Sequence, residues 1–345
     1  MESGRAHTGG VSHNSAHKRR RARISASGGE GVVTVSAFDF PSASGQDRIR
    51  CRAWTPDGTV RGAVQLVHGV AEHTGRYGAF GETLAAHGYA VVGDDHLGHG
   101  LTAADASERG WFAESDGWEK LLRDERTLRN IIAAKYPGVP IILFGHSMGS
   151  FLARELIARC PGDYAGCVLS GTGHTPVIVC RLGRVLTGLT IRLRGGRYRS
   201  EALQRLAFGR YLRGVENPVG PYAWMCRDEA VVRAFDDDPL CGFTGTAELM
   251  HEMLKGLEHI ARPSLMRRVN PALPVLIVSG EADPVGGWGR GVRTVAERLR
   301  RAGMTDVTLK LYPGARHELV NELNRDEVYA DLLRWLEAAV EKAAA

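Results

Sequence analysis

The sequence lacks the marks of several protein classes. No stretch approaches the roughly 20 apolar residues that a transmembrane helix needs, and no internal repeat is present. The six cysteines form no C-x-x-C pair and no regular framework, so we expect free thiols and a cytoplasmic protein. The zinc motif HExxH is absent, and no cofactor is indicated. What remains is a chain of 345 residues, which suits one large domain with an insertion or two domains.

The positive charge is concentrated near the N-terminus. The net charge is +5, and residues 1–30 hold six basic residues but only two acidic ones. The segment 1–31 is poor in large apolar residues, so we expect a disordered basic tail. No apolar region follows the basic run at 18–23, which does not favour a secretory signal peptide. Because short basic runs are unspecific signals, we expect a solvated tail and no nucleic-acid partner.

From residue 32 onward, short apolar strands alternate with amphipathic helices. Antiparallel edge strands are expected at 32–38 and 49–54, and buried strands at 63–67, 89–93, 141–144 and 167–170. Helical spacing is clearest between Trp118 and Tyr136. The alternation predicts an α/β fold with a mostly parallel, doubly wound sheet that has helices on both faces.

The alternation stops at about Gly173 and resumes after Asn270. Between these residues apolar side chains recur at helical spacing without a parallel-strand signal, which predicts a mainly helical cap at 173–270. The core would then consist of residues 32–172 and 271–345, with late strands at 275–278 and 307–312. Apolar residues and arginines are mixed at 177–194. They predict either transient contact with a membrane surface or a helix packed on the cap's own core.

A glycine-flanked serine follows one of the buried strands. Residues 141–144 are apolar, and Phe151, Leu152 and Leu156 recur at helical spacing after them. Ser147 therefore lies at a strand-to-helix turn in the pattern G-x-S-x-G, in which the glycines allow a tight turn that exposes the serine oxygen. A chance match is possible in a chain with 43 glycines, but the strand–turn–helix context argues against it. We predict that Ser147 is a nucleophile.

A serine hydroxyl needs a base to take its proton and an acid to orient that base. On a fold of this kind the acid and then the histidine follow the serine, each in a loop after a late strand. Asp283 follows the strand at 275–278, and His317 follows the strand at 307–312. We predict His317 as the general base and Asp283 as its carboxylate partner. Glu281 is the rival acid, but Asp283 is better placed in the loop.

Acyl transfer through a serine also needs donors for the oxyanion. The backbone N–H of Met148, directly after the nucleophile, is one candidate, and the N–H of Val70 in the loop after strand 63–67 is the other. Because these would be main-chain donors, the apolar side chains of both residues are compatible with the role.

A polar loop offers a competing interpretation as a metal site. Its residues are Asp94, Asp95, His96 and His99, which His68 and His73 could join. No partner with metal-ligand spacing follows in the second half of the chain. A hydrogen-bonded loop that shapes the pocket is therefore favoured, and no metal is predicted.

These motifs together resemble the α/β-hydrolase family that contains monoacylglycerol lipases and bacterial lysophospholipase-like enzymes, often grouped with serine aminopeptidases of the S33 type. The resemblance covers about residues 33–340, and it rests on the segments 68–77, 95–100, 145–149, 280–284 and 312–318. It implies the α/β-hydrolase fold, the triad of Ser147, Asp283 and His317, and the oxyanion donors Val70 and Met148.

Residues and resemblance together predict a serine hydrolase that cleaves carboxylic esters through an acyl-enzyme. The expected substrate is a small lipid-type ester such as a monoacylglycerol or a lysophospholipid. One alternative is an aminopeptidase or amidase on the same fold, for which Asp236–Asp238 is the candidate site for a substrate amine. The other is a non-catalytic binding protein, against which an intact triad argues.

Overall fold

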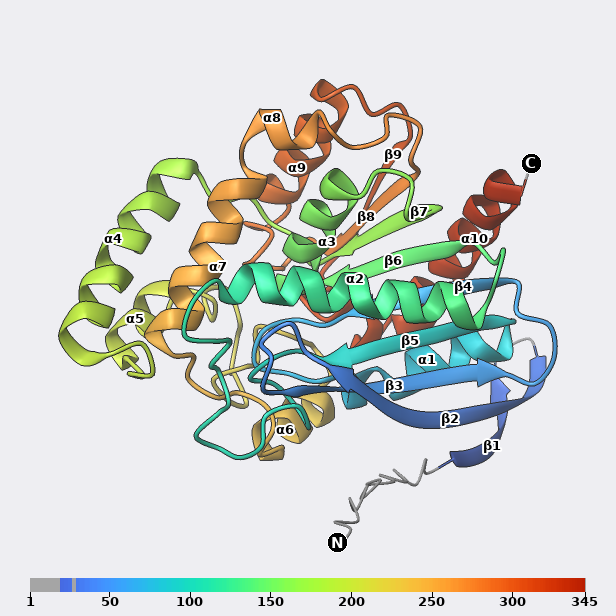
Figure 1. The fold of residues 1–345 in the computed structure, drawn as a ribbon, viewed down its shortest axis with the longest axis horizontal. Helices are drawn as coiled ribbons and strands as arrows, with labels where there is room; N and C mark the ends of the chain where they lie inside the picture. Colours follow the sequence, from blue (N-terminus) through green and yellow to red (C-terminus); the bar gives the residue numbers. More distant parts are fainter. Residues whose placement is uncertain (1–18, 27–28, 345) are drawn as a thin grey trace, which may run out of the picture.

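The computed structural model describes residues 19–26 and 29–344 (Figure 1). Within them lies one nine-stranded sheet with the order β1-β2-β3-β5-β4-β6-β7-β8-β9. The pairs β1–β2, β2–β3 and β3–β5 are antiparallel. The remaining neighbours in the sheet, β5–β4, β4–β6, β6–β7, β7–β8 and β8–β9, are parallel. The strands are β1 Arg19–Ala26, β2 Gly29–Pro41, β3 Arg48–Pro56, β4 Gly62–Val67, β5 Tyr89–Asp95, β6 Ile141–His146, β7 Gly166–Ser170, β8 Val275–Gly280 and β9 Val307–Tyr312.

Helices follow most of the parallel strands. They are η1 Thr74–Tyr77, α1 Gly78–Ala86, α2 Gly117–Lys135, α3 Met148–Arg159, α4 Val177–Arg194, α5 Glu201–Phe208, α6 Glu229–Asp237, α7 Ala247–Ile260, α8 Pro263–Met266, α9 Arg290–Arg301, η2 Leu319–Asn321 and α10 Arg325–Ala344. Among the described helices, none is both long enough and apolar enough to cross a bilayer.

The central strands are buried on both faces. Ile141 and Leu143 of β6 belong to the core that also holds residues of α2, α3 and α9. Ile142 and Phe144, which alternate with them, pack in a second core with residues of α1 and α10. Because successive side chains of a strand point to opposite faces, each β6 residue is buried under one helical layer or the other. This layering confirms the predicted α/β-hydrolase fold.

The chain between β7 and β8 forms the helices α4 to α8. An isolated antiparallel bridge between Arg199 and Thr246 joins two of its loops. In Figure 1, α4, α5 and α6 lie beyond the end of the sheet to which β5 points. The parallel strands therefore end beneath these helices, and a site at their carboxyl ends is covered. The division into core and cap at residues 173 and 270 remains our interpretation; below, the cap means residues 173–270.

The prediction of a disordered tail over residues 1–31 is wrong for residues 19–26 and 29–31. The first segment forms β1, the second begins β2, and the two strands pair from Arg19 opposite Ser36 to Ala26 opposite Gly29. Composition missed this strand because pairing at a sheet edge uses backbone N–H and C=O groups and does not require large apolar side chains. Residues 1–18, which include the start of the basic run, lie outside the described residues.

Candidate active site

Ser147 lies at the turn between β6 and α3 with a left-handed backbone, φ 52° and ψ −119°. A non-glycine residue rarely adopts this conformation, which costs about 1–3 kcal/mol. A Cβ on Gly145 would clash with the carbonyl oxygen of Gly149, and a Cβ on Gly149 would clash with that of Val67. Both flanking positions therefore require glycine, and the turn places Ser147 at the N-terminus of α3.

Asp283 and His317 form a buried pair. Oδ2 of Asp283 lies 2.9 Å from Nδ1 of His317, and the two residues are 0% and 2% exposed. The carboxylate of Asp283 also accepts hydrogen bonds from the hydroxyl of Ser279 at 3.1 Å and from the N–H of Val285 at 2.8 Å. Burial lowers the pKa of His317, but the charge of Asp283, its hydrogen bond and the charges of Glu318 and Glu72 together outweigh burial, so the pKa is raised. Asp283 thus stabilises the protonated imidazole that forms when His317 accepts a proton.

Ser147 and His317 line the same cavity, which has a volume of about 370 Å³. In the described part of the chain no hydrogen bond joins their side chains; such bonds often tighten only when substrate binds. Gly171 allows the histidine to approach, because a Cβ there would lie 2.8 Å from Cε1 of His317. The structure therefore brings the predicted base to the predicted nucleophile across one small space.

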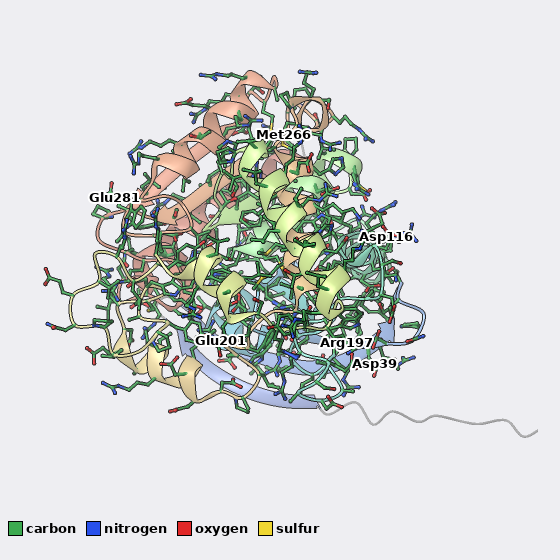
Figure 2. The ribbon with its side chains drawn as sticks, turned by 90° about the vertical axis from the view of Figure 1, so that its left-hand side faces the viewer. Asp39, Asp116, Arg197, Glu201, Met266 and Glu281 are labelled. Atoms are coloured by element: carbon green, nitrogen blue, oxygen red, sulfur yellow. The ribbon has the colours of Figure 1, made fainter. Side chains whose placement is uncertain are left out.

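The rival acid Glu281 lies on the surface. Its side chain is exposed and appears at the edge of the molecule in Figure 2. The backbone N–H of Glu281 donates to the carbonyl oxygen of Tyr312, but its carboxylate has no hydrogen-bond or ion-pair partner among the described residues. Of the two acids, Asp283 is the one that contacts His317.

Val70 and Met148 both line the cavity beside Ser147. Met148 is the first residue of α3, where the N–H has no partner within the helix. The N–H of Val70 has no hydrogen bond to any other described residue. Two main-chain donors are thus available at the cavity wall, next to the serine, as an oxyanion hole requires.

Three charged residues join the loop after β4 to the loop that carries His317. Arg76 binds Glu318 through both terminal nitrogens, and it binds Glu72 at 3.0 Å. Glu72 in turn accepts the N–H of Gly69 at 2.6 Å and the hydroxyl of Tyr77 at 2.8 Å. Arg76, Glu72 and Glu318 lie in motifs that the sequence shows, but their pairing joins residues 242 apart in sequence and was not predicted.

The remaining cavity wall is mostly apolar and comes largely from the cap, although Thr175, Gln204 and Arg205 also line it. The rings of Trp224 and His317 are 5.3 Å apart, and Tyr211 packs against Trp224 with ring centroids 4.8 Å apart. Further apolar lining side chains come from α3, α5 and α7: Phe151, Phe208, Leu249, Met250, Met253 and Leu257. An apolar chain is therefore the kind of group that this cavity accommodates.

The polar loop after β5 is held by hydrogen bonds. Asp95 accepts the N–H and the hydroxyl of Thr74 at 2.9 and 2.6 Å, and the N–H of Leu101 at 2.8 Å. The rings of His96 and His68 are stacked 3.8 Å apart. These contacts are those of a hydrogen-bonded loop, as predicted, but the residues named here do not line the cavity, so a role in shaping it stays a prediction.

Two groups among the described residues have ligand-type atoms within 4.8 Å of one another and so could hold a metal ion. The first is Asp94, His96 and Glu125, all buried below the loop. Burial, and then the charge of Asp94, raise the pKa of Glu125 well above its usual value. Protonation of Glu125 removes the repulsion between its carboxylate and that of Asp94. The three side chains are therefore stable together when they share protons.

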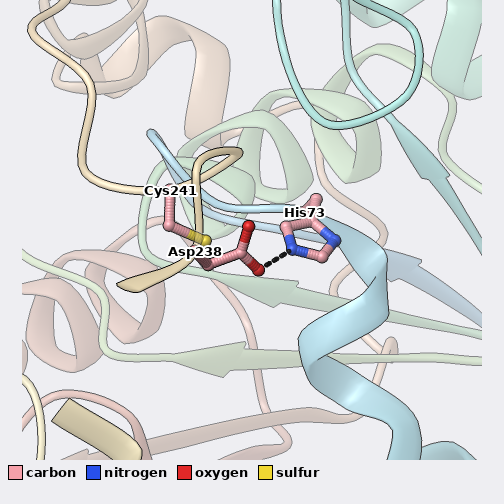
Figure 3. A group of neighbouring side chains, drawn as sticks. All are labelled: His73, Asp238 and Cys241. Atoms are coloured by element: carbon pink, nitrogen blue, oxygen red, sulfur yellow. Dashed lines mark hydrogen bonds and ion pairs between the residues drawn. The ribbon is translucent and has the colours of Figure 1, made fainter. Parts of the chain in front are cut away.

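The second group is His73, Asp238 and Cys241 (Figure 3). Nδ1 of His73 accepts the N–H of Gly75 at 3.1 Å, so in the neutral ring Nε2 carries the proton and donates it to Asp238 at 2.9 Å. A metal on Nε2 would need that nitrogen unprotonated and would disturb the bond to Gly75. The geometry therefore favours a hydrogen bond, between His73 and Asp238, that links the loop after β4 to the cap.

The fold and this arrangement define an α/β-hydrolase. The family Hydrolase_4, described as serine aminopeptidase, S33, matches residues 58–324. The chain therefore belongs to this family.

Named relatives agree with this assignment. The monoacylglycerol lipase of Mycolicibacterium smegmatis is 31% identical over 315 residues, which cover 88% of this chain and 97% of that protein. The human monoglyceride lipase is 29% identical over 290 residues, 83% of this chain and 86% of that protein. A crystal structure of a thermostable carboxyl esterase from Bacillus coagulans, in complex with glycerol, has 30% identity and a TM-score of 0.83, and it covers 89% of this chain and 99% of that one. These relatives support a carboxylic ester hydrolase and confirm the predicted resemblance.

Proposed function

We propose that the protein hydrolyses a lipid-type carboxylic ester, such as a monoacylglycerol or a lysophospholipid, through an acyl-enzyme on Ser147. The observation that carries the proposal is the buried pair of Asp283 and His317, 2.9 Å apart, which faces the same apolar cavity as the strained Ser147. The relatives that are named monoacylglycerol lipases support the substrate class.

In the first half of the reaction, Oγ of Ser147 attacks the ester carbonyl carbon while Nε2 of His317 takes its proton. The carbonyl oxygen becomes an oxyanion that accepts hydrogen bonds from the N–H groups of Val70 and Met148. Such donors are worth about 3 kcal/mol each. Asp283 fixes the ring so that Nε2 faces the serine, and it stabilises the imidazolium.

Collapse of the tetrahedral intermediate then breaks the bond to the alcohol oxygen. His317 gives its proton to that oxygen, and the alcohol leaves. In the second half, a water loses a proton to His317 and attacks the acyl carbon. The second tetrahedral intermediate releases the carboxylic acid, and the proton returns to Ser147. No metal takes part in these steps.

A fluorophosphonate probe tests the nucleophile. We expect the wild-type protein and Ser150→Ala to be labelled and Ser147→Ala not to be. Ser150 is a matched control because it lies one turn further along α3, and among the described residues its hydroxyl bonds only to the carbonyl oxygen of Ser147. Full esterase activity in folded Ser147→Ala would contradict the proposal. Absence of both labelling and hydrolysis in the folded wild type would favour the alternative of a non-catalytic binding protein.

A panel of glycerol and p-nitrophenyl esters with graded acyl chains tests the substrate class. We expect kcat/KM to rise with chain length until the chain fills the cavity, since each buried CH₂ is worth about 0.8 kcal/mol. A preference for acetyl esters over all longer chains would contradict a lipid-type substrate.

The peptidase alternative needs a free carboxylate for the substrate amine. Asp236 and Asp237 are exposed, Asp238 is paired with His73, and none of the three lines the cavity. The carboxylates that do line it, Glu72 and Glu318, are both bound by Arg76. These contacts favour esters, and aminoacyl-anilides assayed beside the ester panel provide the test.

We further propose that α4 touches a lipid surface. It packs on α7 through one face, while apolar side chains on its other face are 41–72% exposed: Ile178, Val179, Leu182, Val185, Leu186, Leu189 and Leu193. Figure 2 looks onto α4 and α5. Residues 177–213 also hold nine arginines and one acid, Glu201, which suits anionic lipid. A cytoplasmic location remains a prediction from the six free cysteines.

A further inference from the structure

Trp224 of the cap lies against the ring of His317. The two ring centroids are 5.3 Å apart, and the ring planes are tilted by 41°. Among the described residues, His146 supplies the other aromatic ring beside His317, with a centroid distance of 4.6 Å. Trp224 is half-buried and lines the same cavity as Ser147 and His317. The predicted general base therefore has an indole ring beside it, which the sequence did not predict.

Hydrogen bonds link the chain on either side of His317 to the chain on either side of the indole. Nη1 of Arg316 donates to the carbonyl oxygen of Ala223 at 2.6 Å. The backbone N–H of Glu318 donates to the carbonyl oxygen of Met225 at 2.8 Å. The residues before and after the histidine thus bind the residues before and after the tryptophan. Although this tryptophan belongs to the cap, its backbone is fixed to the loop that carries His317.

Further contacts hold the two segments together and fix the indole ring. The buried carboxylate of Glu322 accepts the backbone N–H of Arg316 at 2.8 Å and that of Arg227 at 3.1 Å, so it joins both segments. Tyr211 packs against Trp224 with ring centroids 4.8 Å apart and ring planes 72° apart. Because backbone and ring are both held, the indole is oriented against the histidine before any substrate binds.

The indole interacts differently with the two protonation states of His317. The face of a tryptophan ring is negative, and it attracts a cation that lies within about 6 Å of the ring centroid. The distance of 5.3 Å falls within this range. The other charged or titratable groups that face His317 are Asp283, His146, Glu318 and Glu72, and Arg76 pairs with both glutamates. Burial, and then the charge of His317, lower the pKa of His146 to about 4, so His146 stays neutral while His317 is protonated.

We propose that Trp224 is a positioning residue for the reaction, because its indole holds the ring of His317 and stabilises the imidazolium that forms when Ser147 loses its proton. The proton path is the one given above, from Oγ of Ser147 to Nε2 of His317, and Trp224 takes part in no bond-making step. The inference rests on the proposed ester hydrolysis, in which His317 is the general base. The contact between the two rings can be tested without it.

An NMR titration of the full chain with isotope-labelled histidine tests the contact. The Cε1–H signal of His317 is the one that disappears in His317→Gln. We expect its pKa in Trp224→Leu to be roughly 0.5–1 pH unit lower than in wild type, because leucine has no π face, and in Trp224→Phe to lie between the two. Trp335→Leu is the matched control, since Trp335 is half-buried on α10 and does not line the cavity. A pKa at or above the wild-type value in either folded Trp224 variant, or an equal fall in Trp335→Leu, would overturn the proposal.

Kinetics on a p-nitrophenyl ester test whether the contact contributes to catalysis. In Trp224→Leu the acid limb of kcat/KM should move to lower pH by the amount that NMR measures, and kcat above the limb should fall by roughly 10-fold. Trp224→Phe should lose less, and Trp335→Leu should keep the wild-type profile. A fall in kcat with an unmoved limb would reduce Trp224 to a packing residue and overturn the proposal. Absence of hydrolysis in wild type would overturn the proposed function instead, and the NMR result would still decide whether the indole stabilises the imidazolium.

Discussion

Nδ1 of His68 lies 2.7 Å from the carbonyl oxygen of Gly69, and both residues are buried. Nε2 of the same ring accepts the backbone N–H of His96 at 3.1 Å, so Nδ1 carries the proton and donates it. The C=O and N–H of a trans peptide point in opposite directions. The bond to Gly69 therefore turns the N–H of Val70 away from His68 and leaves it available to the cavity.

Loss of this bond should weaken the proposed oxyanion hole. We expect His68→Leu to lower kcat on a p-nitrophenyl ester by roughly 10²-fold with little change in KM, because the oxyanion exists only in the transition state. His68→Asn should recover part of kcat, since its amide can donate to Gly69. Burial lowers the pKa of His68 well below its usual value, so the loss should not vary with assay pH. A rise in KM without a fall in kcat, or an equal fall in kcat in both variants, would contradict this role.

The pair of Asp283 and His317 predicts the pH profile. The general base must be neutral, so kcat/KM should fall as pH drops through the pKa of His317. Asp283 raises that pKa above its ordinary value of 6.5, so we expect the acid limb above pH 6.5. In Asp283→Asn the limb should move to lower pH, and kcat should fall by roughly 10⁴-fold by analogy with serine proteases. The exposed Asp237→Asn is the control. An acid limb unmoved in Asp283→Asn would show that another group titrates.

The core of the fold and the predicted site residues were accessible from the sequence because their signals are local. A strand buried on both faces must be apolar throughout, as 141–144 is, and a Cβ clash makes Gly149 obligatory. The chain order of Ser147, Asp283 and His317 then matched a structure in which Ser147 and His317 line one cavity and Asp283 is buried against His317. Their catalytic roles remain proposals.

Other features depend on contacts that no local pattern encodes. The ion pair between Arg76 and Glu318 joins distant loops, and the pairing of Arg154 with a carbonyl oxygen gives no pattern at all. β1 is held by backbone pairing, which composition does not report. In the cap, amphipathic spacing predicted helices but not which face of α4 would be exposed.

Gly171 tests whether backbone strain can be separated from site geometry. It has φ +59°, and a Cβ there would lie 2.8 Å from His317, whereas Gly214 has φ +83° and open space around it. Alanine at either position should cost roughly 1–2 kcal/mol of stability through the positive φ. Only Gly171→Ala should also lose kcat, because His317 must move. Urea unfolding and esterase assays on both variants measure this, and full activity in Gly171→Ala would contradict it.

The exposed face of α4 should determine lipid binding. Replacing Leu182, Val185 and Leu189 by serine should reduce partition onto phosphatidylserine-containing vesicles by roughly 10-fold or more. Hydrolysis of a dissolved short-chain ester should not change. Leu323→Ser is the matched control, because Leu323 is 62% exposed but lies outside the cap. Binding of wild type should also weaken with added salt. Equal binding by the triple variant would contradict the proposed contact.

Arg76 should contribute strongly to stability. Its side chain is 10% exposed and those of Glu72 and Glu318 are 4% exposed, so Arg76→Met leaves two buried carboxylates unpaired. We expect a loss of roughly 3–5 kcal/mol in urea unfolding at pH 7.5. Arg205→Met should change stability by less than about 0.5 kcal/mol, since Arg205 and its partner Glu201 are exposed.

The loss in Arg76→Met should depend on pH through Glu318. Burial raises the pKa of Glu318, but the charge and hydrogen bonds of Arg76, with smaller contributions from His146 and His317, outweigh burial and lower the pKa below 4.5. A lowered pKa stabilises the fold above the unfolded-state pKa, and this stabilisation disappears as pH falls through the folded-state value. The difference between wild type and Arg76→Met should therefore be full at pH 7.5 and shrink toward pH 4. A difference that grows on acidification would show that repulsion between the two glutamates is not what destabilises the variant.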